Sequence, residues 1–597
     1  MRKLIFLFVL VNSINTFAQT GVIRGTVLDK QSEKSIAGAT IVLLSDPNKG
    51  TITDENGSFE LKNVPLGRQT IQINYLGYES STVPDIDLTA GKDFVISVYL
   101  IEKFDSLEEV VIVAEGNNKA KSINKLAAVS VRQFSPEEVN RYAGGRSDVA
   151  RLASNFAGVS TSDDSRNDIV VRGNSPTGLL WRLEGIPIPS PNHFSTLGTT
   201  GSPVSALNPN LLSNSDFITS AFPAEYGNAI GGVFDLSLRK GNNKDYEYSV
   251  GVAAFPGAEV MAEGPLGKKG GSFLVAGRYG IVGVLGLAGT TAQPNYNDFS
   301  FNIDLGKSKW GNFSIFGIFG NSNIDLIGKD VELSNDDLFA TRDEDSFVTS
   351  GFGVFGIKHT LDIGSKSYLK TVISSSTSVE TFERDRYFNL ETPTEFKIRW
   401  TEVDNTESRI TFSTLFNSKI SKKFTFRSGL LLESFTLENR LTDRDRQEDN
   451  NGDDLPDFVN LISNDGSYSI VQPYATGQFR FTEKLTLNAG LHGQYFSLNE
   501  EFVIEPRTSL TYAINNKSSI NIGYGLHHQN VAAPLLFLNE TIGDNLVQSN
   551  RNLDLVRSAH YVIGYDLRFA NKWRTKFEIY YQAIDKAAVE KTPTVYS

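Results

Sequence analysis

The 597-residue sequence contains no cysteine and only 2 methionines. The absence of cysteine excludes disulfides, thiolate metal sites, a cysteine nucleophile and a lipid-modified N-terminal cysteine. The mean hydropathy of -0.21 excludes a bundle of membrane helices. The sequence is instead rich in glycine (51), phenylalanine (39) and tyrosine (21), which favours strands, turns and aromatic surfaces. Composition therefore predicts a mainly β protein.

Two classes of function have little support in the sequence. The formal charge is -12 and no dense basic run is present, so nucleic acid is not an expected partner. No Gly-x-Ser-x-Gly, His-Glu-x-x-His or P-loop motif occurs, and the six histidines form no recognisable catalytic set. The adjacent His527 and His528 are expected to face opposite sides of a strand. We therefore predict that the protein is not an enzyme and needs no cofactor.

The N-terminus has the pattern of a secretory signal peptide. Arg2 and Lys3 precede an apolar stretch from Leu4 to Val11, and a cleavage site follows at Ala18. The apolar stretch is too short for a membrane anchor, which needs about 20 residues. We predict that residues 1–18 are removed and that the remaining chain is exported.

Residues 19–103 contain a compact series of short strand candidates separated by turn residues such as those at 54–57. About seven short strands in this length predict a small β-sandwich. A spacer or adhesion module without chemistry of its own is an equally compatible role.

Residues 120–243 are predicted to form a small α+β domain. Ser135 can cap a helix that begins at Pro136, with Glu138 completing a capping box. A second helix is expected from about Val149, ending at Gly158. Three strand candidates, IVVRG, LLWRLEGIPI and GGVFDLSLRKG, follow.

From residue 244 to 597 the sequence predicts a succession of strands of roughly ten residues that alternate between apolar and polar positions, as membrane-spanning β-strands do. In residues 485–495, for example, Leu487, Ala489 and Leu491 alternate with Asn488 and His492. A soluble barrel or sandwich alternates as well. Short turns that contrast with long acidic loops, and aromatic residues near the strand ends, favour an antiparallel transmembrane β-barrel.

Two longer motifs resemble a known family. VVRGNSPTGLLWRLEGIPI and FPAEYGNAIGGVFDLSLRKG resemble the plug domain of TonB-dependent outer-membrane receptors, and IQINYLGYES looks like the end of the carboxypeptidase-regulatory-like sandwich of Bacteroidetes-type receptors. The resemblance implies a receptor of the cell outer membrane. It also implies a 22-stranded barrel, whereas residues 244–597 offer about 14 to 16 strands. We therefore expect that the C-terminal part of the barrel is missing from this sequence. The alternative is a smaller closed barrel, which could hardly enclose a plug of residues 120–243.

The stretch LEEVVIVAE at 107–115, within a linker at 104–119, is similar to the Ton box that a TonB-type inner-membrane protein grips as an added strand. The alternative is a last strand of the sandwich or a first strand of the plug. The residues assigned to this partner-binding segment are Leu107, Glu108, Glu109, Val110, Val111, Ile112, Val113 and Ala114.

The resemblance also marks charged plug positions that could hold the plug inside a polar lumen. The gating candidates are Arg172, Gly173, Arg182, Glu184 and Gly185. Arg172 is the strongest single candidate, and its alternative is a solvated loop arginine. The pair Glu184-Gly185 stands where the family often has Asp-Gly.

These features predict an importer that binds a ligand at the cell surface and releases it into the periplasm, using energy from the TonB complex. The alternatives are a ligand-binding or signalling receptor, or a surface adhesin, without active transport. Expected partners are the TonB-type protein, outer-membrane lipid, a small-molecule, glycan or peptide ligand, and a surface lipoprotein.

One acidic loop has a weak resemblance to calcium-binding loops. Asp449, Asn451, Asp453 and Asp457 place oxygen ligands around a glycine turn, but the full EF-hand pattern and its closing glutamate are missing. A solvated acidic loop is the favoured interpretation, so no metal site is predicted.

Overall fold

The computed structural model describes residues 20–90, 93–103, 122–161, 166–195, 201–253, 256–281, 293–331, 341–444, 449, 452, 455–515, 517–542, 545–569 and 573–589. The chain divides near residue 121 into two compact units, and the short segment 569–573 groups with the first of them. Within the described ranges, no helix is both long enough and apolar enough to span a membrane.

The first unit contains a β-sandwich of two sheets with orders β4-β1-β7 and β3-β2-β5-β6. Its strands are β1 (Thr20–Asp29), β2 (Thr40–Leu43), β3 (Asp46–Ile52), β4 (Ser58–Pro65), β5 (Gly67–Asn74), β6 (Ser81–Leu88) and β7 (Phe94–Leu100). The apolar residues that alternate along these strands, such as Ile23, Ile41 and Ile71, are fully buried between the sheets. The predicted small sandwich is confirmed.

The second unit begins with the middle domain, whose central sheet has the order β12-β11-β16-β15-β8. These strands are β8 (Val131–Phe134), β11 (Leu179–Leu183), β12 (Ile186–Pro187), β15 (Ser215–Ile218) and β16 (Gly232–Leu236). Trp181, Phe217 and Phe234 stack in its core, with ring centroids 4.3 and 4.4 Å apart. Smaller elements complete the domain: β9 (Val159–Thr161), β10 (Ile169–Val171), β13 (Asn192–His193), β14 (Val204–Ser205), η2 (Pro176–Gly178) and η3 (Pro209–Leu211).

The two predicted helices of the middle domain are present, but the second is shorter than expected. α2 (Pro136–Arg141) has the complete capping box, with the Ser135 side chain accepting from the Glu138 amide and the Glu138 side chain accepting from the Ser135 amide. α3 (Val149–Ala153) ends at Ala153 rather than at Gly158. The Asp148 side chain caps its start, and Phe156 packs into the core from the turn that follows.

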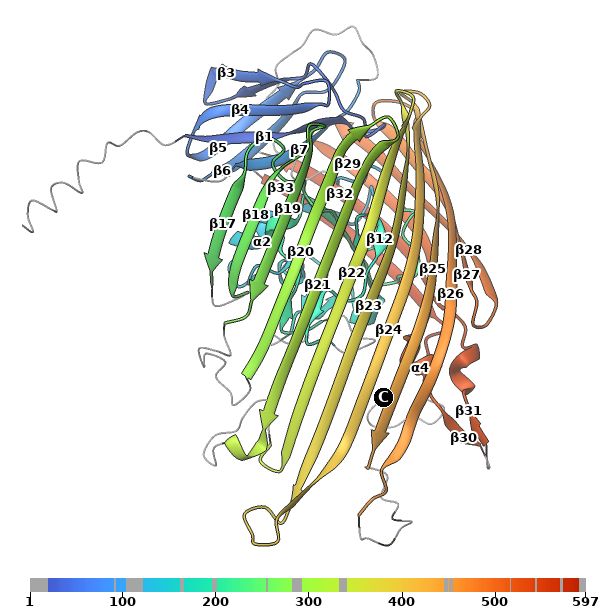
Figure 1. Cartoon of the computed structure of the whole chain (residues 1–597). Coiled ribbons are helices and arrows are strands. Elements are labelled where there is room, and N and C mark those ends of the chain that lie inside the picture. Colours follow the sequence, from blue (N-terminus) through green and yellow to red (C-terminus); the bar gives the residue numbers. More distant parts are fainter. Residues whose placement is uncertain are drawn as a thin grey trace, which may run out of the picture. The chain divides into compact units, whose positions relative to one another are not determined.

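The rest of the second unit is a 15-stranded antiparallel sheet, here called the barrel sheet, running in order from β17 to β33. Figure 1 shows this order as a colour change from green to red. Its strands are β17 (Glu247–Val252), β18 (Ala258–Leu266), β19 (Gly271–Tyr279), β20 (Gln293–Ser308), β21 (Gly311–Ile327), β22 (Glu344–Ile363), β23 (Ser367–Phe388), β24 (Phe396–Lys419), β25 (Phe424–Asp443), β26 (Val459–Arg480), β27 (Leu485–Phe496), β28 (Glu501–Asn515), β29 (Ser518–Gln529), β32 (Val556–Phe569) and β33 (Trp573–Asp585).

The strand number falls within the predicted range, but several strands are longer than the expected ten residues. β22 to β26 each have 20 to 24 residues. About ten residues suffice to cross a bilayer, so these strands extend beyond it. Every turn at one end of the barrel sheet is short, such as 420–423 and 481–484, whereas the opposite end carries long connections such as 530–555. Bacterial barrels have their short turns in the periplasm.

The long connections hold the remaining elements, which are η4 (Gly328–Asp330), α4 (Ala533–Leu536), β30 (Glu540–Ile542), β31 (Asn545–Val547) and η5 (Ser549–Asn552). The predicted alternation in 485–495 is confirmed: Asn488 and His492 are buried, whereas Leu491 is 57% exposed. Buried polar side chains of this kind contact the middle domain, which therefore lies on the concave side of the barrel sheet.

Candidate gating site between the middle domain and the barrel sheet

The tight turn between β11 and β12 places a buried carboxylate against the barrel sheet. Its two residues, Glu184 and Gly185, both have positive φ, as a type I′ turn requires. Glu184 adopts this unusual conformation while Oε1 accepts from the Leu238 amide at 2.6 Å and Oε2 pairs with Lys358 of β22. A Cβ atom at Gly185 would lie 3.2 Å from Nζ of Lys370. The turn is therefore held by the wall against which it packs.

Burial alone would raise the pKa of Glu184, but the Lys358 ammonium and the Leu238 amide hold that pKa below its ordinary range. Because the folded pKa is the lower one, this carboxylate stabilises the protein at neutral pH. The contribution is lost as the pH falls below the ordinary glutamate value of about 4.3.

The substitution Glu184→Gln tests this linkage. We expect the variant to have a lower melting temperature than the native protein at pH 7, and the difference to shrink as the pH is lowered through the acid range. Thermal unfolding followed by circular dichroism measures both. Glu137→Gln, at a surface ion pair with Arg141, is the matched control. A difference for Glu184→Gln that stays constant with pH contradicts the assignment.

A second buried group, here called the latch cluster, consists of Arg182, Glu225, Tyr226 and Asp235 of the middle domain and Arg427 of β25. Arg182 lies 3.8 Å from both Glu225 and Asp235, and its guanidinium lies 4.8 Å from the centre of the Tyr226 ring. Arg427 pairs with Glu225 at 2.9 Å, and the Tyr226 hydroxyl donates to Asp235 at 2.7 Å. The latch cluster therefore contains two cationic and two carboxylate side chains, so its formal charges balance.

Charge pairing dominates the titration of the latch cluster. Burial alone would raise the pKa of Glu225, but Arg427 and Arg182 hold it below its ordinary range. Burial would likewise lower the pKa of Arg182, and Asp235 with Glu225 raise it instead. Glu225 and Arg182 are therefore charged at neutral pH, and each depends on its partners.

Asn124 connects the start of the middle domain to the latch cluster. Its side-chain amide donates to Glu225 at 2.5 Å and to the Tyr226 hydroxyl at 2.7 Å. The backbone amides of Ile123 and Asn124 donate to the carboxylate of Asp216 at 3.0 and 2.8 Å. The first described residues after position 121 are therefore tied directly to the buried charges.

Arg172 forms a third contact with the barrel sheet. Its guanidinium donates to Glu578 of β33 at 2.5 Å and to the Ser130 hydroxyl at 2.9 Å, and it lies 4.2 Å from the centre of the Tyr580 ring. The side chain is only 2% exposed. The alternative of a solvated loop arginine is therefore wrong. Arg172 itself has positive φ, and so does the following Gly173, at which a Cβ atom would meet no neighbour.

Replacing Arg172 tests the strength of this contact. We expect Arg172→Ala to lower the free energy of unfolding by about 2 kcal/mol, because Glu578 loses one charged hydrogen-bond donor and keeps Lys576. Arg172→Lys should recover only part of the loss, since an ammonium cannot make both contacts and stack on a ring. Urea denaturation monitored by tryptophan fluorescence measures the change. Arg141→Ala, at an exposed pair, is the control; equal effects of the two alanine variants would contradict the assignment.

The segment 221–228 docks its backbone onto the barrel sheet. Arg507 of β28 donates to the carbonyls of Pro223, at 2.7 Å, and of Tyr226. The ring nitrogen Nδ1 of His492 lies 2.8 Å from the Ala224 carbonyl. Backbone carbonyls can be recognised in this way whatever side chains they carry. The sequence alone therefore gave no signal for these contacts.

The segment 221–228 packs tightly against the barrel sheet. A Cβ atom at Gly227 would lie 1.9 Å from Oε1 of Gln472, so only glycine fits there. The Phe222 ring packs on His527, with centroids 4.6 Å apart. His528, expected on the opposite face of the strand, is buried as well. This expectation was wrong because β29 ends one residue later and His528 Nδ1 meets the inward carboxylate of Glu505 at 3.0 Å.

The structure therefore places four of the five gating candidates at two contacts with the barrel sheet, and the fifth in the latch cluster. Arg172 with Gly173 and Glu184 with Gly185 lie at the wall, whereas Arg182 pairs with carboxylates of its own domain. Sequence reasoning missed the residues that complete the site, which are Asn124, Glu225, Tyr226, Asp235, Arg427 and Glu578. Glu225 and Tyr226 belong to the motif FPAEYGNAIGG, whose single charged residue, Glu225, was an available signal.

Two other predicted sites fall wholly or partly outside the described residues. The partner-binding segment, Leu107 to Ala114, lies outside them. Of the weak calcium candidates, Asn451 and Asp453 lie outside, and Oδ1 of Asp449 accepts from the Gly452 amide at 2.6 Å. Within the described ranges, no group of three or more histidine, cysteine or acidic residues could hold a metal ion.

Comparison with known proteins gives this architecture a family context. Residues 22–100 match the family model of the carboxypeptidase regulatory-like domain, and residues 124–233 match that of the TonB-dependent receptor plug domain. The middle domain is therefore a plug domain. The chain is 23% identical over 236 residues to the TonB-dependent transporter Oar of Myxococcus xanthus, a match that covers 38% of this chain. It covers about a fifth (21%) of that relative's length.

Solved structures with the same fold are outer-membrane receptors. The pyoverdine-bound receptor FpvA of P. aeruginosa is 13% identical, with a TM-score of 0.55 over 76% of this chain and 62% of that one. The outer membrane transporter YddB of Escherichia coli is 12% identical, with a TM-score of 0.52 over 74% of this chain and 67% of that one. These likenesses establish the fold. Together with the two domain matches, they give the chain the architecture of a TonB-dependent receptor of the outer membrane.

Proposed function

We propose that this protein is an active importer that binds a ligand at the cell surface and releases it into the periplasm when a TonB-type partner pulls on residues 107–115. The observation that carries the proposal is the attachment of the plug. It is held to the barrel sheet by paired charges and hydrogen bonds, at Arg172, Glu184 and the latch cluster. Such contacts keep the plug closed and can be exchanged for water when it moves.

The chain enters the plug at the end from which a periplasmic partner can pull. The Lys125 ammonium donates to Oδ1 of Asn417 at 3.2 Å, and the Lys125 carbonyl accepts from the side-chain amide of Gln478 at 3.2 Å. Both contacted residues lie three positions before a short turn of the barrel sheet. Because short turns are periplasmic, a force on the preceding segment would reach Asn124 first and then Glu225 and Tyr226.

The order of contacts suggests how the gate responds. The next plug residues to bear the force are Ser130, whose amide and hydroxyl donate to Glu578, and then β8. β8 is an edge strand that pairs with β15 alone. An edge strand can leave a sheet without breaking the pairing of the strands that remain. Removal of residues 122–134 would therefore open the plug while its inner sheet, β11, β16 and β15, stays paired.

The test is whether an energised partner exposes this part of the plug, and whether deletion of residues 107–115 stops the exposure. A receptor that binds or signals without transport, or an adhesin, would keep the plug closed under both conditions. The deletion should also abolish uptake while leaving ligand binding unchanged. The ligand, whether a small molecule, glycan or peptide, can then be sought with the closed and opened forms as separate binding targets.

A further inference from the structure

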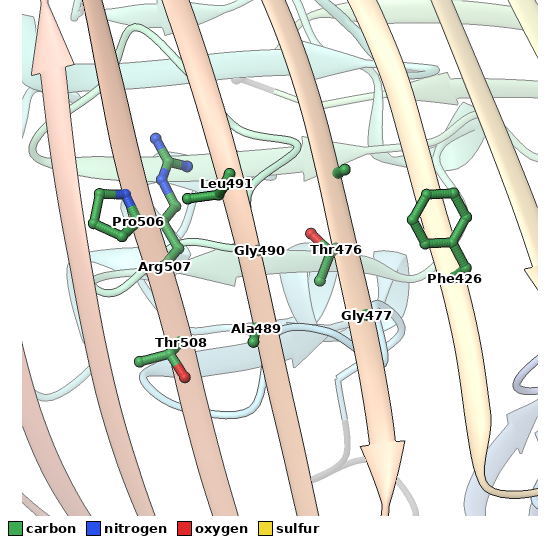
Figure 2. Close-up of a pocket in the computed structure, with 10 residues that line it drawn as sticks. Phe426, Thr476, Gly477, Ala489, Gly490, Leu491, Pro506, Arg507 and Thr508 are labelled. Carbon is green, nitrogen blue, oxygen red and sulfur yellow. The ribbon is translucent and has the colours of Figure 1, made fainter.

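The convex face of the barrel sheet carries an apolar groove across β25 to β28, with a volume of about 430 Å³. Figure 2 shows its lining on four neighbouring strands, with Phe426 at one side, Pro506 at the other, and Gly477 and Ala489 between them. Thr508 and Leu491 complete its outward lining. The groove lies on the side of the sheet that faces the bilayer.

The strand register explains why a groove forms here. Phe426, Gly477, Ala489 and Thr508 lie directly opposite one another on successive strands and form one row across the sheet. The next residue in the row is Tyr524. Gly477, Ala489 and Thr508 have smaller side chains than the two aromatic residues at the ends of the row. The surface is therefore recessed between Phe426 and Tyr524. Alternation along the strands directs this row outward.

The inner side of the same wall confirms the direction. The residues that alternate with the row, among them Arg427, Asn488 and Arg507, are buried against the plug. The large outward residues around the groove, such as Leu491 and Ile522, are exposed. In a membrane this face is covered by hydrocarbon. A groove in it offers one acyl chain closer van der Waals contact than the flatter surface around it.

The depth of the groove fits one leaflet. Ala489 lies five residues beyond Lys484 of the short turn, which corresponds to roughly 17 Å along the strand. Strands of such barrels tilt by about 35 to 45°, so this distance becomes a depth of roughly 13 Å. Half of a hydrocarbon core is about 15 Å. A lipid whose head group lies at Lys484 would therefore reach the groove with the end of an acyl chain.

The short turns at the periplasmic end supply charge for a head group. Lys423, Lys484 and Lys517 lie in three consecutive short turns at the ends of the strands that form the groove, and all three are exposed. Basic residues at a membrane surface attract anionic lipid head groups. The distance between the apolar groove and the basic turns therefore suits one phospholipid, with its acyl chain at the groove and its phosphate at the turns.

We propose that this wall binds one phospholipid of the periplasmic leaflet, with an acyl chain in the groove and the phosphate among the three lysines. The lipid covers the outer side of the strands whose inner side holds the plug through Arg427 and Arg507. Its binding does not depend on transport, so it can be tested separately from the proposed function.

The experiment uses the purified full chain in detergent, titrated with dipalmitoyl phosphatidylglycerol and measured by native mass spectrometry. Ala489→Leu fills the groove, and Ala475→Leu is a second filling variant on the neighbouring strand. Ser375→Leu adds the same side chain to an exposed, bilayer-facing position of β23 and is the control. A triple variant, Lys423→Ser, Lys484→Ser and Lys517→Ser, tests the head-group contact. Circular dichroism verifies that each variant is folded.

We expect the native chain and Ser375→Leu to retain one phospholipid, and each filling variant to lower its affinity at least tenfold. The triple variant should weaken binding as well, and inorganic phosphate should not compete. Equal affinity of the native chain and both filling variants overturns the proposal. So does competition by inorganic phosphate with no effect of filling, which indicates an anion site at the turns. A filling variant that changes only the oligomeric state would assign the groove to a second copy of the chain instead.

Discussion

A single cysteine at position 127 should react with a membrane-impermeant thiol reagent only in cells that hold an energised TonB-type partner, and deletion of residues 107–115 should abolish the reaction. Ala127 is buried inside the plug, in an apolar cluster that includes Phe222 and Tyr226. It lies three residues after Asn124, where a pull from the periplasm arrives first. Because the native chain has no cysteine, Ala127→Cys supplies the only thiol.

The expected increase in labelling rate on energisation is at least about tenfold, which corresponds to lowering the cost of opening by roughly 1.4 kcal/mol. Asn56→Cys, at an exposed turn of the sandwich, is the control and should react equally under all conditions. Unchanged labelling at position 127 after removal of residues 107–115 would show that this segment is not the handle. Labelling that never depends on energy would favour a binding or signalling receptor.

Glu225→Gln should loosen the plug more than any other single substitution in the latch cluster. Glu225 is the carboxylate that both Arg182 and Arg427 contact, and it also accepts from Asn124. Removing the charge from a buried ion pair typically costs about 3 to 5 kcal/mol, because the remaining charges are left without compensation. With Ala127→Cys as reporter and no partner present, labelling should become about a hundredfold faster or more.

Two further variants separate a lost ion pair from general damage. Glu137→Gln removes a plug carboxylate at the surface and should change the labelling rate little. Adding Arg427→Met to Glu225→Gln removes one of the stranded cations and should recover part of the closed state. A native labelling rate in Glu225→Gln, or a further acceleration in the double variant, would contradict the assigned role of the cluster.

The fold followed from local patterns because each depends on residues close together in the sequence. The alternation in 485–495 gives β27, and the residues from Ser135 to Glu138 give the capped start of α2. LLWRLEGIPI was expected as one strand, whereas the tight turn at Glu184-Gly185 divides it into β11 and β12. The end of α3 was misplaced because Phe156 continues the apolar periodicity after the backbone has left the helix. Periodicity reports which residues are buried and does not report the backbone hydrogen bonds that end a helix.

The site was only half predictable because its pairs are distant in sequence. Arg172 and Glu578 are separated by 406 residues, and Glu225 and Arg427 by 202. A single sequence shows that each of these charges exists and gives no information on which of them meet. The plug motif identified Arg172 but not Glu225, and only the strand register and the docking of the plug show which wall residue each of them meets.

The pairing of plug and wall charges has a consequence for what passes once the plug withdraws. Arg427 and Lys358 belong to the wall, and their carboxylate partners, Glu225 and Glu184, belong to the plug. Withdrawal of the plug leaves these two cations facing an aqueous path. It also leaves three wall acids, Glu578, Glu263 and Asp304, without their partners Arg172, Arg239 and Lys240. The opened conduit therefore carries wall charges of both signs that were neutralised while it was shut, and a charged cargo meets attraction or repulsion according to the part of the wall that it passes.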